Sequence, residues 1–519
     1  MRASDRKTLI YDDFPYDDFP FRPTHPDALG TIAGLFGLAP APSEACRVLE
    51  LGCGLGGNLL AMAASLPGSR FVGMDLSAVQ IEHAQAEAAA LGLTNLEFFV
   101  GDIQALSPAL GSFDYIICHG VWSWVPPAVQ EAIFRLCREL LQPQGVAFIS
   151  YNVLPGWYFR GALRQLILRA VPATGTPEER AAAARAYIEA LGEHAPVQRS
   201  LAAQLLKSEV DLIRPLSDRY LFHEHLADHN HAVWFTDFVA RAGEHGLQYL
   251  GDGELHGMIP ERYGPETAAW VRRGQPDQVT LEARLDELGL RFFRRSLLCH
   301  AEASLDRGIG ADELAGHWIA SLLTPNADDV DLEPGVPATF TATDGFAVST
   351  SQPLLKAALV LLDAEQPRGM RLEELTQAAC GQIGEAYSNA AVVELTESLL
   401  ELLTQGYVEV CRAQPRFVLK GGRRPRATPL ARRQAAQGRD GVFNQRHVSV
   451  AIDRMERAML PLLDGRTDRA ALADAMHAAA ARGDFEVSIG GEPVTDRAVM
   501  GEVVDAKLDR LGRMALLIG

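Results

Sequence analysis

The chain has 519 residues, of which 48% are hydrophobic and 22% charged, a balance typical of globular proteins and not of disordered ones. It carries 48 Lys and Arg against 66 Asp and Glu, a formal net charge of −18, which argues against nucleic acid as a partner because phosphate binding needs a basic surface. Seven scattered cysteines without a CxxC pair exclude a disulfide scaffold and favour a reducing, cytoplasmic compartment. We expect no secretory signal and no membrane span, because no apolar run approaches about 18 residues.

The first forty residues are rich in aromatic residues, aspartate and proline. Tyr11–Pro15 reads YDDFP and is repeated directly as Tyr16–Pro20. Proline removes backbone donors and restricts the residue before it, so we expect no helix here. Because aromatic side chains are costly to leave in water, residues 1–40 are predicted to form an extended arm laid over the body of the protein.

From residue 46 to residue 151, short apolar runs alternate with amphipathic stretches. This alternation is typical of a parallel sheet whose strands are connected by helices. Strands are predicted at 47–51, 70–75, 95–100, 113–118 and 145–151, with helices at 58–65 and 77–91. The pattern predicts the α/β class, with a Rossmann-like, doubly wound sheet in a domain that spans residues 41–302.

The sequence changes character after Tyr151. Residues from about 160 to 232 are rich in Ala, Arg, Glu and Leu and are predicted to form a helical insertion without strands. The sheet is then expected to resume, with a helix at 234–246 and strands at 247–255 and 291–300.

Two further units are predicted beyond residue 310. A winged-helix-like domain at 311–420 is inferred from helices at 352–365, 371–379 and 389–405, followed by a hairpin of 406–410 and 416–419. A linker and a C-terminal helical domain are expected at 421–519. The linker has seven basic residues between 420 and 439, and beside a winged helix these also suggest nucleic acid. The acidic net charge favours instead a solvated linker docked on the acidic body, without a nucleic-acid partner.

The sharpest motif is Glu50-Leu51-Gly52-Cys53-Gly54-Leu55-Gly56-Gly57-Asn58, between the first predicted strand and the first helix. Glycines at 52, 54 and 56 let the backbone turn sharply and approach a ligand closely. The spacing is GxGxG and not the GxGxxG of nicotinamide enzymes. Glu50 would repel a pyrophosphate but could attract an ammonium group, as in S-adenosylmethionine.

Two more acidic residues follow the next two strands. Asp75, followed by Leu76, ends the second strand, where a carboxylate can accept both hydroxyls of a ribose. Asp102, followed by Ile103, comes after the third strand, where a carboxylate can accept the amino group of an adenine. Each of these acids could equally cap a helix, but their order and spacing favour a nucleoside with a cationic tail.

These residues resemble those of the class I S-adenosylmethionine-dependent methyltransferases, and within them the bacterial enzymes with a methyltransferase regulatory domain, a group that includes protein-lysine methyltransferases. Further stretches that carry the resemblance are Pro20–Pro26, Cys118–Pro126, Tyr151–Trp157, Tyr220–Leu226, Ala427–Arg432 and Leu462–Gly465. The resemblance implies a regulatory region at about 220–302, S-adenosylmethionine as cofactor, and a lysine of a protein as methyl acceptor. It also implies that Asn58, Leu76, Ile103 and His119 contribute to the cofactor site.

The acceptor is expected where the loops after the fourth and fifth strands meet the methyl group, since ligands bind at the carboxyl ends of parallel strands. Candidate catalytic residues there are His119, Trp122, Tyr151, Asn152 and Trp157. Two alternatives stay open: the tryptophans could simply pack in the core, and His119 could donate to a backbone carbonyl without acting as a base.

A histidine-rich run, His223 to His231, also suggests a metal. The HExxH spacing is absent, so we expect a structural segment near the substrate cleft and no metal. Other interpretations of the whole chain are a small-molecule methyltransferase and a non-catalytic protein that senses S-adenosylmethionine. A homodimer is also left open.

Overall fold

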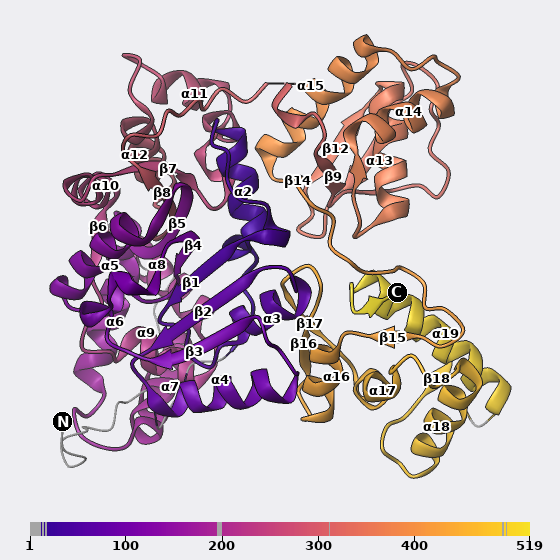
Figure 1. Cartoon of the computed structure of the whole chain (residues 1–519), viewed down its shortest axis with the longest axis horizontal. Coiled ribbons are helices and arrows are strands. Elements are labelled where there is room, and N and C mark those ends of the chain that lie inside the picture. Colours follow the sequence, from indigo (N-terminus) through magenta and orange to yellow (C-terminus); the bar gives the residue numbers. More distant parts are fainter. Residues whose placement is uncertain are drawn as a thin grey trace.

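The computed structural model of the chain describes residues 12, 15, 18–194, 200–310, 312–489, 492–494 and 496–519. Tyr11, Phe14 and Tyr16 of the expected arm lie outside these residues. Figure 1 shows a large sheet domain, a second unit around α13–α15, and a C-terminal domain beside α3 and α4.

The large domain is built on one mixed sheet. Its strands are β1 (Arg47–Leu51), β2 (Arg70–Asp75), β3 (Leu96–Val100), β4 (Phe113–Cys118), β5 (Leu141–Leu154), β6 (Ala232–Trp234), β7 (Leu247–Asp252) and β8 (Phe293–His300). The order is β3-β2-β1-β4-β5-β8-β7, with β6 paired to the end of β5. The first five strands in this order run parallel, and β8 is antiparallel to both of its neighbours. The predicted doubly wound sheet is confirmed.

The strands form because apolar residues fill both faces of the sheet. In β1, Val48 packs into one core and Leu49 and Leu51 into another; in β4, Tyr115 and Ile117 alternate with neighbours on the opposite face in the same way. Successive strand residues point to opposite faces, so this alternation requires a cover of helices on each side.

Helices cover the two faces. On one lie α2 (Pro26–Leu35), α3 (Gly57–Ser65) and α4 (Ala78–Ala90), and on the other α5 (Pro127–Leu140) and α10 (Phe235–Glu244). The regulatory region adds α11 (Pro265–Val271) and α12 (Gln278–Gly289). The prediction of an arm without helix over residues 1–40 is wrong for α2. Its proline occupies the first turn, where no backbone donor is needed, and the His25 ring accepts a hydrogen bond from the Asp27 amide.

The described part of the predicted insertion consists of helices joined by short loops, and β6 begins at its last residue. It comprises α6 (Trp157–Ala170), α7 (Pro177–His194), α8 (Leu201–Ile213) and α9 (Asp218–His225), which enclose a small core of their own. The insertion therefore stands beside the end of β5 as a separate helical layer (Figure 1).

The second unit contains β9 (Trp318–Ser321), β10 (Thr324–Pro325), β11 (Ala338–Thr341), β12 (Ala347–Thr350), α13 (Pro353–Glu365), β13 (Met370–Arg371), α14 (Leu372–Ile383), α15 (Asn389–Gln405) and β14 (Val408–Cys411). Its three helices are as predicted. The predicted hairpin is wrong: β14 pairs with β9, and residues 416–419 form no strand. Val418 donates instead to the carbonyl of Leu517 near the C-terminus, a partner that sequence spacing does not reveal.

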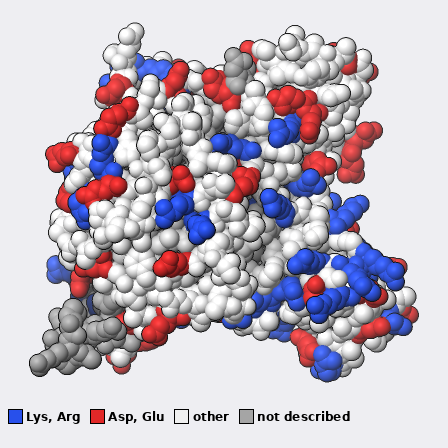
Figure 2. Space-filling model, in the orientation of Figure 1, with Lys and Arg blue, Asp and Glu red and all other residues white. Residues whose placement is uncertain are grey.

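The C-terminal domain contains β15 (Arg426–Ala427), α16 (Pro429–Ala436), β16 (Gly441–Phe443), β17 (Ser449–Ala451), α17 (Arg454–Met459), α18 (Arg469–Ala481), β18 (Ser488–Ile489), β19 (Glu492–Pro493), α19 (Arg497–Arg513) and β20 (Leu517–Ile518). Part of the predicted linker is therefore helix α16. Its expected docking is present, because the Arg433 guanidinium bonds the Glu87 carboxylate of α4 at 2.7 Å. Lys and Arg gather over this domain (Figure 2), and nine basic and no acidic residues occur between Arg412 and Arg439.

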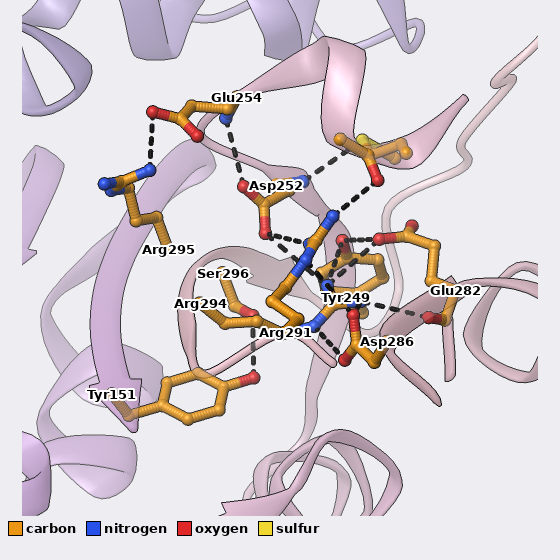
Figure 3. Close-up of polar contacts among 12 residues, drawn as sticks. Tyr151, Tyr249, Asp252, Glu254, Glu282, Asp286, Arg291, Arg294, Arg295 and Ser296 are labelled. Carbon is orange, nitrogen blue, oxygen red and sulfur yellow. Dashed lines mark hydrogen bonds and ion pairs between the residues drawn. The ribbon is translucent and has the colours of Figure 1, made fainter. Parts of the chain in front are cut away.

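A buried charge cluster fixes β8 to α12 within the regulatory region (Figure 3). The Arg294 guanidinium is 1% exposed and bonds the carboxylates of Asp286 at 2.7 Å and Glu282 at 3.0 Å. The Tyr249 hydroxyl donates to Glu282 at 2.7 Å. Removing one member of such a cluster leaves the others charged and without compensation in a medium of low polarity.

We therefore expect Arg294→Met to lower the free energy of unfolding by about 3–5 kcal/mol, measured by denaturant titration. Arg135→Ala, which breaks a half-exposed ion pair with Glu139 within α5, is the control and should cost less than about 0.5 kcal/mol. Equal losses in the two variants would contradict the role assigned to the buried cluster.

Candidate functional site

The glycine loop after β1 has the shape of a ligand cradle. Gly52, Gly54 and Gly56 all have positive φ, at 76°, 54° and 83°, a region that other residues rarely adopt. A Cβ on Gly56 would lie 2.7 Å from Phe98 and 2.9 Å from Ala84. The loop therefore needs glycine for its conformation and for its packing.

Glu50 is the penultimate residue of β1, just before this loop. Its side chain is buried, and the Oε1 atom accepts a hydrogen bond from Asn58 Nδ2 at 2.8 Å. The Oε2 atom is buried and finds no hydrogen-bond partner among the described residues. Burial raises the pKa of the Glu50 carboxyl to about 8. A cation that bonded Oε2 would satisfy this atom and ionise the carboxyl, so the site fits an ammonium group.

Asn58 is predicted to contribute to the cofactor site, and its side-chain amide forms its hydrogen bonds with other groups of the protein. The Nδ2 atom donates to Glu50 and to Thr24 Oγ1, at 2.8 and 3.1 Å. The Oδ1 atom accepts from the Phe21 amide at 3.1 Å and from His447 Nε2 at 2.7 Å. The Thr24 hydroxyl also lies 3.2 Å from Oδ1, but its one proton is donated to the Phe21 carbonyl at 2.7 Å. An amide side chain has two donors and two acceptor positions, so all four are in use. Asn58 therefore orients Glu50 and joins three distant segments.

Asp75 and Asp102 lie at the ends of the two strands that follow β1 in the sheet order. The Asp75 carboxylate accepts from the amides of Gly54 and Ser77, at 3.0 and 2.9 Å, which ties β2 to the glycine loop. Leu76 beside it is 55% exposed. Asp102 is exposed and caps a short turn through the Gln104 amide, while Ile103 is buried. With Glu50, these residues form a row along one edge of the sheet.

The N-terminal segment covers this edge. The Asp18 carboxylate accepts from the Gly57 amide at the start of α3, at 2.8 Å, and Asp12 accepts from the Ser77 hydroxyl at 2.5 Å. The Phe21 ring stacks on His119 with a centroid distance of 4.1 Å. Sequence reasoning predicted an arm over the body but missed these site contacts. The repeated YDDFP was the signal that could have directed attention to Asp18.

His119 follows β4 and faces Phe21. Its Nδ1 atom lies 2.9 Å from Ser150 Oγ on β5. Burial and the nearby Arg295 guanidinium lower the pKa of His119 to about 3. The ring is therefore neutral at physiological pH and too weakly basic to serve as an efficient proton acceptor.

Two of the aromatic candidates lie away from the expected mouth. Trp122 and Tyr151 are both fully buried in the core between the sheet, α5 and α10. The Tyr151 ring stacks on Phe238 at 3.9 Å, and its hydroxyl bonds Ser296 at 2.9 Å (Figure 3). Their placement at the mouth is corrected, because large apolar rings gain more by packing in the core than by facing water.

Buried polar atoms without partners gather near the end of β5. Asn152 Oδ1, Trp124 Nε1 and both ring nitrogens of His225 make no hydrogen bond within the described chain. Asn152 Nδ2 donates to Asn230 Oδ1 at 2.9 Å, and Asn230 Nδ2 donates to the carbonyl of Glu224. Buried polar groups are normally paired, so orphaned ones favour a site for a polar ligand. Trp157, at the start of α6, is 6% exposed under the Arg160 guanidinium.

Comparisons with known proteins agree with this arrangement. Family models described as "Methyltransferase domain", "Predicted methyltransferase regulatory domain" and "PKMT, C-terminal winged helix domain" match residues 48–145, 217–300 and 423–516. Uncharacterized protein RP789 of Rickettsia prowazekii (strain Madrid E) is 32% identical over 94% of this chain and 89% of its own. The chain belongs to the class I S-adenosylmethionine-dependent methyltransferases. The matched winged helix lies beyond the unit at 311–420 for which the sequence predicts that fold.

Solved structures extend the likeness of this methyltransferase to almost its whole length. PKMT2 from Rickettsia typhi, one of whose structures is in complex with AdoHcy, is 28% identical, covers 97% of this chain and 100% of its own, and superposes with a TM-score of 0.88. A second protein of Rickettsia prowazekii, RP028, is 36% identical but covers 47% of this chain. The methyltransferase is an enzyme that binds S-adenosylmethionine.

Neither a bilayer span nor a metal centre is found in the described part of the methyltransferase. Its helices there lack the combination of length and apolar character needed to cross a membrane. His, Cys, Asp and Glu side chains of these residues nowhere form a group of three or more able to hold a metal ion.

The Glu50 geometry predicts that cofactor binding releases a proton. In the free methyltransferase at pH 7, a carboxyl with a pKa of about 8 is mostly protonated, and pairing with the cofactor ammonium ionises it. The cofactor amine takes up only a small fraction of a proton at this pH, since its ordinary pKa is near ~7.8. Calorimetry with S-adenosylhomocysteine in buffers of different ionisation enthalpy should therefore show net release of more than half a proton.

Glu50→Gln should abolish this release and weaken binding. Glu139→Gln, on the outer face of α5, is the matched control and should bind and release protons like the wild type. A wild-type protein that binds without proton release would contradict the pairing of Glu50 with the ammonium.

Proposed function

We propose that this methyltransferase transfers a methyl group from S-adenosylmethionine to a lysine side-chain amine of a protein substrate. The observation that carries the proposal is the likeness to PKMT2 from Rickettsia typhi over 97% of the chain, at a TM-score of 0.88. The description of the matched winged helix carries the same abbreviation, which fits protein-lysine methyltransferase. The C-terminal units add surface that suits a macromolecular substrate better than a small molecule. A cytoplasmic location and a homodimer stay predictions.

The cofactor site is assigned to the edge of the sheet where β1, β2 and β3 end. Glu50 pairs with the ammonium, and the glycine loop holds the neighbouring part of the cofactor against the backbone. Asp75 accepts the ribose hydroxyls through the lone pairs that Gly54 and Ser77 leave. Leu76, Ile103 and Asp102 hold the adenine, and the last accepts from its amino group. Exposure of Leu76 supports this assignment, because an apolar side chain at a site edge gains by contact with a flat ring.

S-adenosylmethionine supplies an electrophilic methyl group, and the lone pair of the acceptor nitrogen forms the new N–C bond as the C–S bond breaks. The amine must therefore be neutral, whereas a lysine in water has a pKa near ~10.4. Desolvation at the end of β5 lowers this pKa. Asn152 Oδ1 accepts a hydrogen bond from the amine and aligns its lone pair with the methyl group.

The proton of the lysine ammonium needs an acceptor before transfer. Glu224 is the penultimate residue of α9, and its backbone carbonyl accepts a hydrogen bond from Asn230. Burial raises the pKa of its carboxyl to about 7. A carboxylate with a pKa near neutrality is well matched to accept such a proton. His119, whose pKa is lowered, is neutral and forms one wall of the acceptor site together with Phe21. Trp157 bounds the opposite side of that site.

The proposal is tested by incubating the methyltransferase with S-adenosylmethionine labelled with tritium in its methyl group and an extract of the source cell. We expect label in acid-precipitable, protease-sensitive material, and methyl-lysine after hydrolysis. Gly56→Val, whose side chain clashes with Phe98 and Ala84 in the glycine loop, should give background counts. Label confined to acid-soluble material would contradict a protein acceptor and favour a small molecule. Labelled protein without methyl-lysine would contradict lysine as the acceptor residue and leave a protein substrate in place.

A further inference from the structure

A hairpin of the C-terminal domain reaches Asn58, at the start of α3 beside the glycine loop. Strands β16 and β17 are joined by residues 444–448, and Asn444 Oδ1 accepts from the amides of Arg446 and Val448 at 2.9 and 3.1 Å, which fixes the turn. His447 sits in this turn with a φ of 59°, a left-handed conformation that is uncommon for a residue with a side chain. Such a conformation persists only where its surroundings hold it, so the turn presents the His447 ring in one direction.

The hairpin is clamped onto the N-terminal segment. The Arg22 guanidinium donates to the Arg446 carbonyl at 3.2 Å and to the Glu409 carboxylate at 3.1 Å. Arg446 forms an ion pair with the same carboxylate. The His25 ring packs against His447 with a centroid distance of 5.2 Å. These contacts hold the turn next to Asn58 and to the segment that covers the cofactor site.

The contact between His447 and Asn58 fixes the proton on the histidine. The Phe21 amide is necessarily a donor, so the atom of Asn58 that it contacts is the carbonyl oxygen, Oδ1. His447 Nε2, 2.7 Å from the same oxygen, must therefore donate. Burial, His25 and Arg22 lower the pKa of His447, so the ring is neutral and Nδ1 carries no proton. The ring thus supplies one donor, used on Asn58.

We propose that His447 is a positioning residue for the cofactor: by donating to Asn58 Oδ1, it holds the Asn58 amide in the orientation that aims Glu50 at the cofactor ammonium. The C-terminal domain, 389 residues along the chain from Asn58, thereby completes the cofactor site without contacting the cofactor. Without the His447 donor, one acceptor position of Asn58 is empty and the amide can rotate. Its bond to Glu50 Oε1 then weakens, and with it the ionised form of Glu50 that the ammonium needs.

The inference does not depend on the methyl acceptor, so it is tested by cofactor binding alone. His447→Phe keeps a ring and removes the donor, and we expect calorimetry with S-adenosylhomocysteine to give about a five- to tenfold higher Kd than for the full-length wild type. His447→Gln retains an N–H donor on a side chain of similar reach and should stay within about twofold of the wild type. Both Kd values are measured on protein whose folded state is checked by its Tm.

Arg433→Ala is the matched control. It removes the bidentate ion pair with Glu87, a second link between the C-terminal domain and the sheet domain that does not touch Asn58. Its Kd should equal that of the wild type. A rise in Kd as large as that of His447→Phe would overturn the proposal, because it would assign the effect to docking in general. A folded His447→Phe that binds like the wild type would also overturn it.

A rescue experiment covers the case in which His447→Phe fails to fold. A cavity of about 310 Å³, lined by Arg22, His25 and Arg446, adjoins His447 and gives a small molecule access to its position. In His447→Ala, free imidazole at pH 8, where it is neutral, should lower the raised Kd toward the wild-type value, while the wild type should be unaffected. Weakened binding that imidazole leaves unchanged would overturn the assignment of a hydrogen bond from the ring.

Discussion

The four hydrogen bonds of the Asn58 amide connect the parts of the molecule to which we assign cofactor binding. Glu50 belongs to the first strand, Phe21 and Thr24 to the segment before the sheet, and His447 to the C-terminal domain. A buried amide with every donor and acceptor satisfied has one orientation, since any rotation leaves a polar atom unpaired. The orientation of Glu50 is therefore set jointly by three segments that are distant in sequence.

The electrostatics of the site follow from burial. Glu50 and Asp18 are removed from water, and burial raises the pKa of both carboxyls, so that a cationic ligand is favoured over an anionic one. Two nearby imidazoles, His119 and His447, are held neutral and add no positive charge. Lys and Arg gather instead over the C-terminal domain (Figure 2). Under the proposed assignment, the ammonium and the sulfonium of the cofactor meet an acidic, enclosed edge of the sheet.

The central sheet could be predicted because its strands are short apolar runs, and the glycine, acidic or capping residues that follow them mark where each strand ends. Strands at 47–51, 70–75 and 113–118 have the predicted bounds, and Ser77 caps its helix through the Gln80 amide as expected. The α2 helix was missed because prolines near its start suggested an extended arm, although proline is favourable in a first turn. The strand predicted at 416–419 failed because an apolar run does not indicate its partner, which here is Leu517.

The site could be predicted in part. Glu50, the three glycines, Asp75 and Asp102 lie at neighbouring strand ends, as their order along the chain implies. Trp122 and Tyr151 pack in the core, because residue type alone does not distinguish a buried ring from one at a mouth. The contacts of Asp18 and His447 with α3 could not be predicted, since each depends on a segment whose position is set by tertiary packing.

The most direct measurement is a crystal structure of the full chain with S-adenosylhomocysteine. The account predicts that the ligand ammonium lies within about 3 Å of Glu50 Oε2, and that Asn58 keeps its bonds to Glu50, Phe21, Thr24 and His447. An ammonium bound elsewhere, or an Asn58 amide turned to contact the ligand directly, would contradict it.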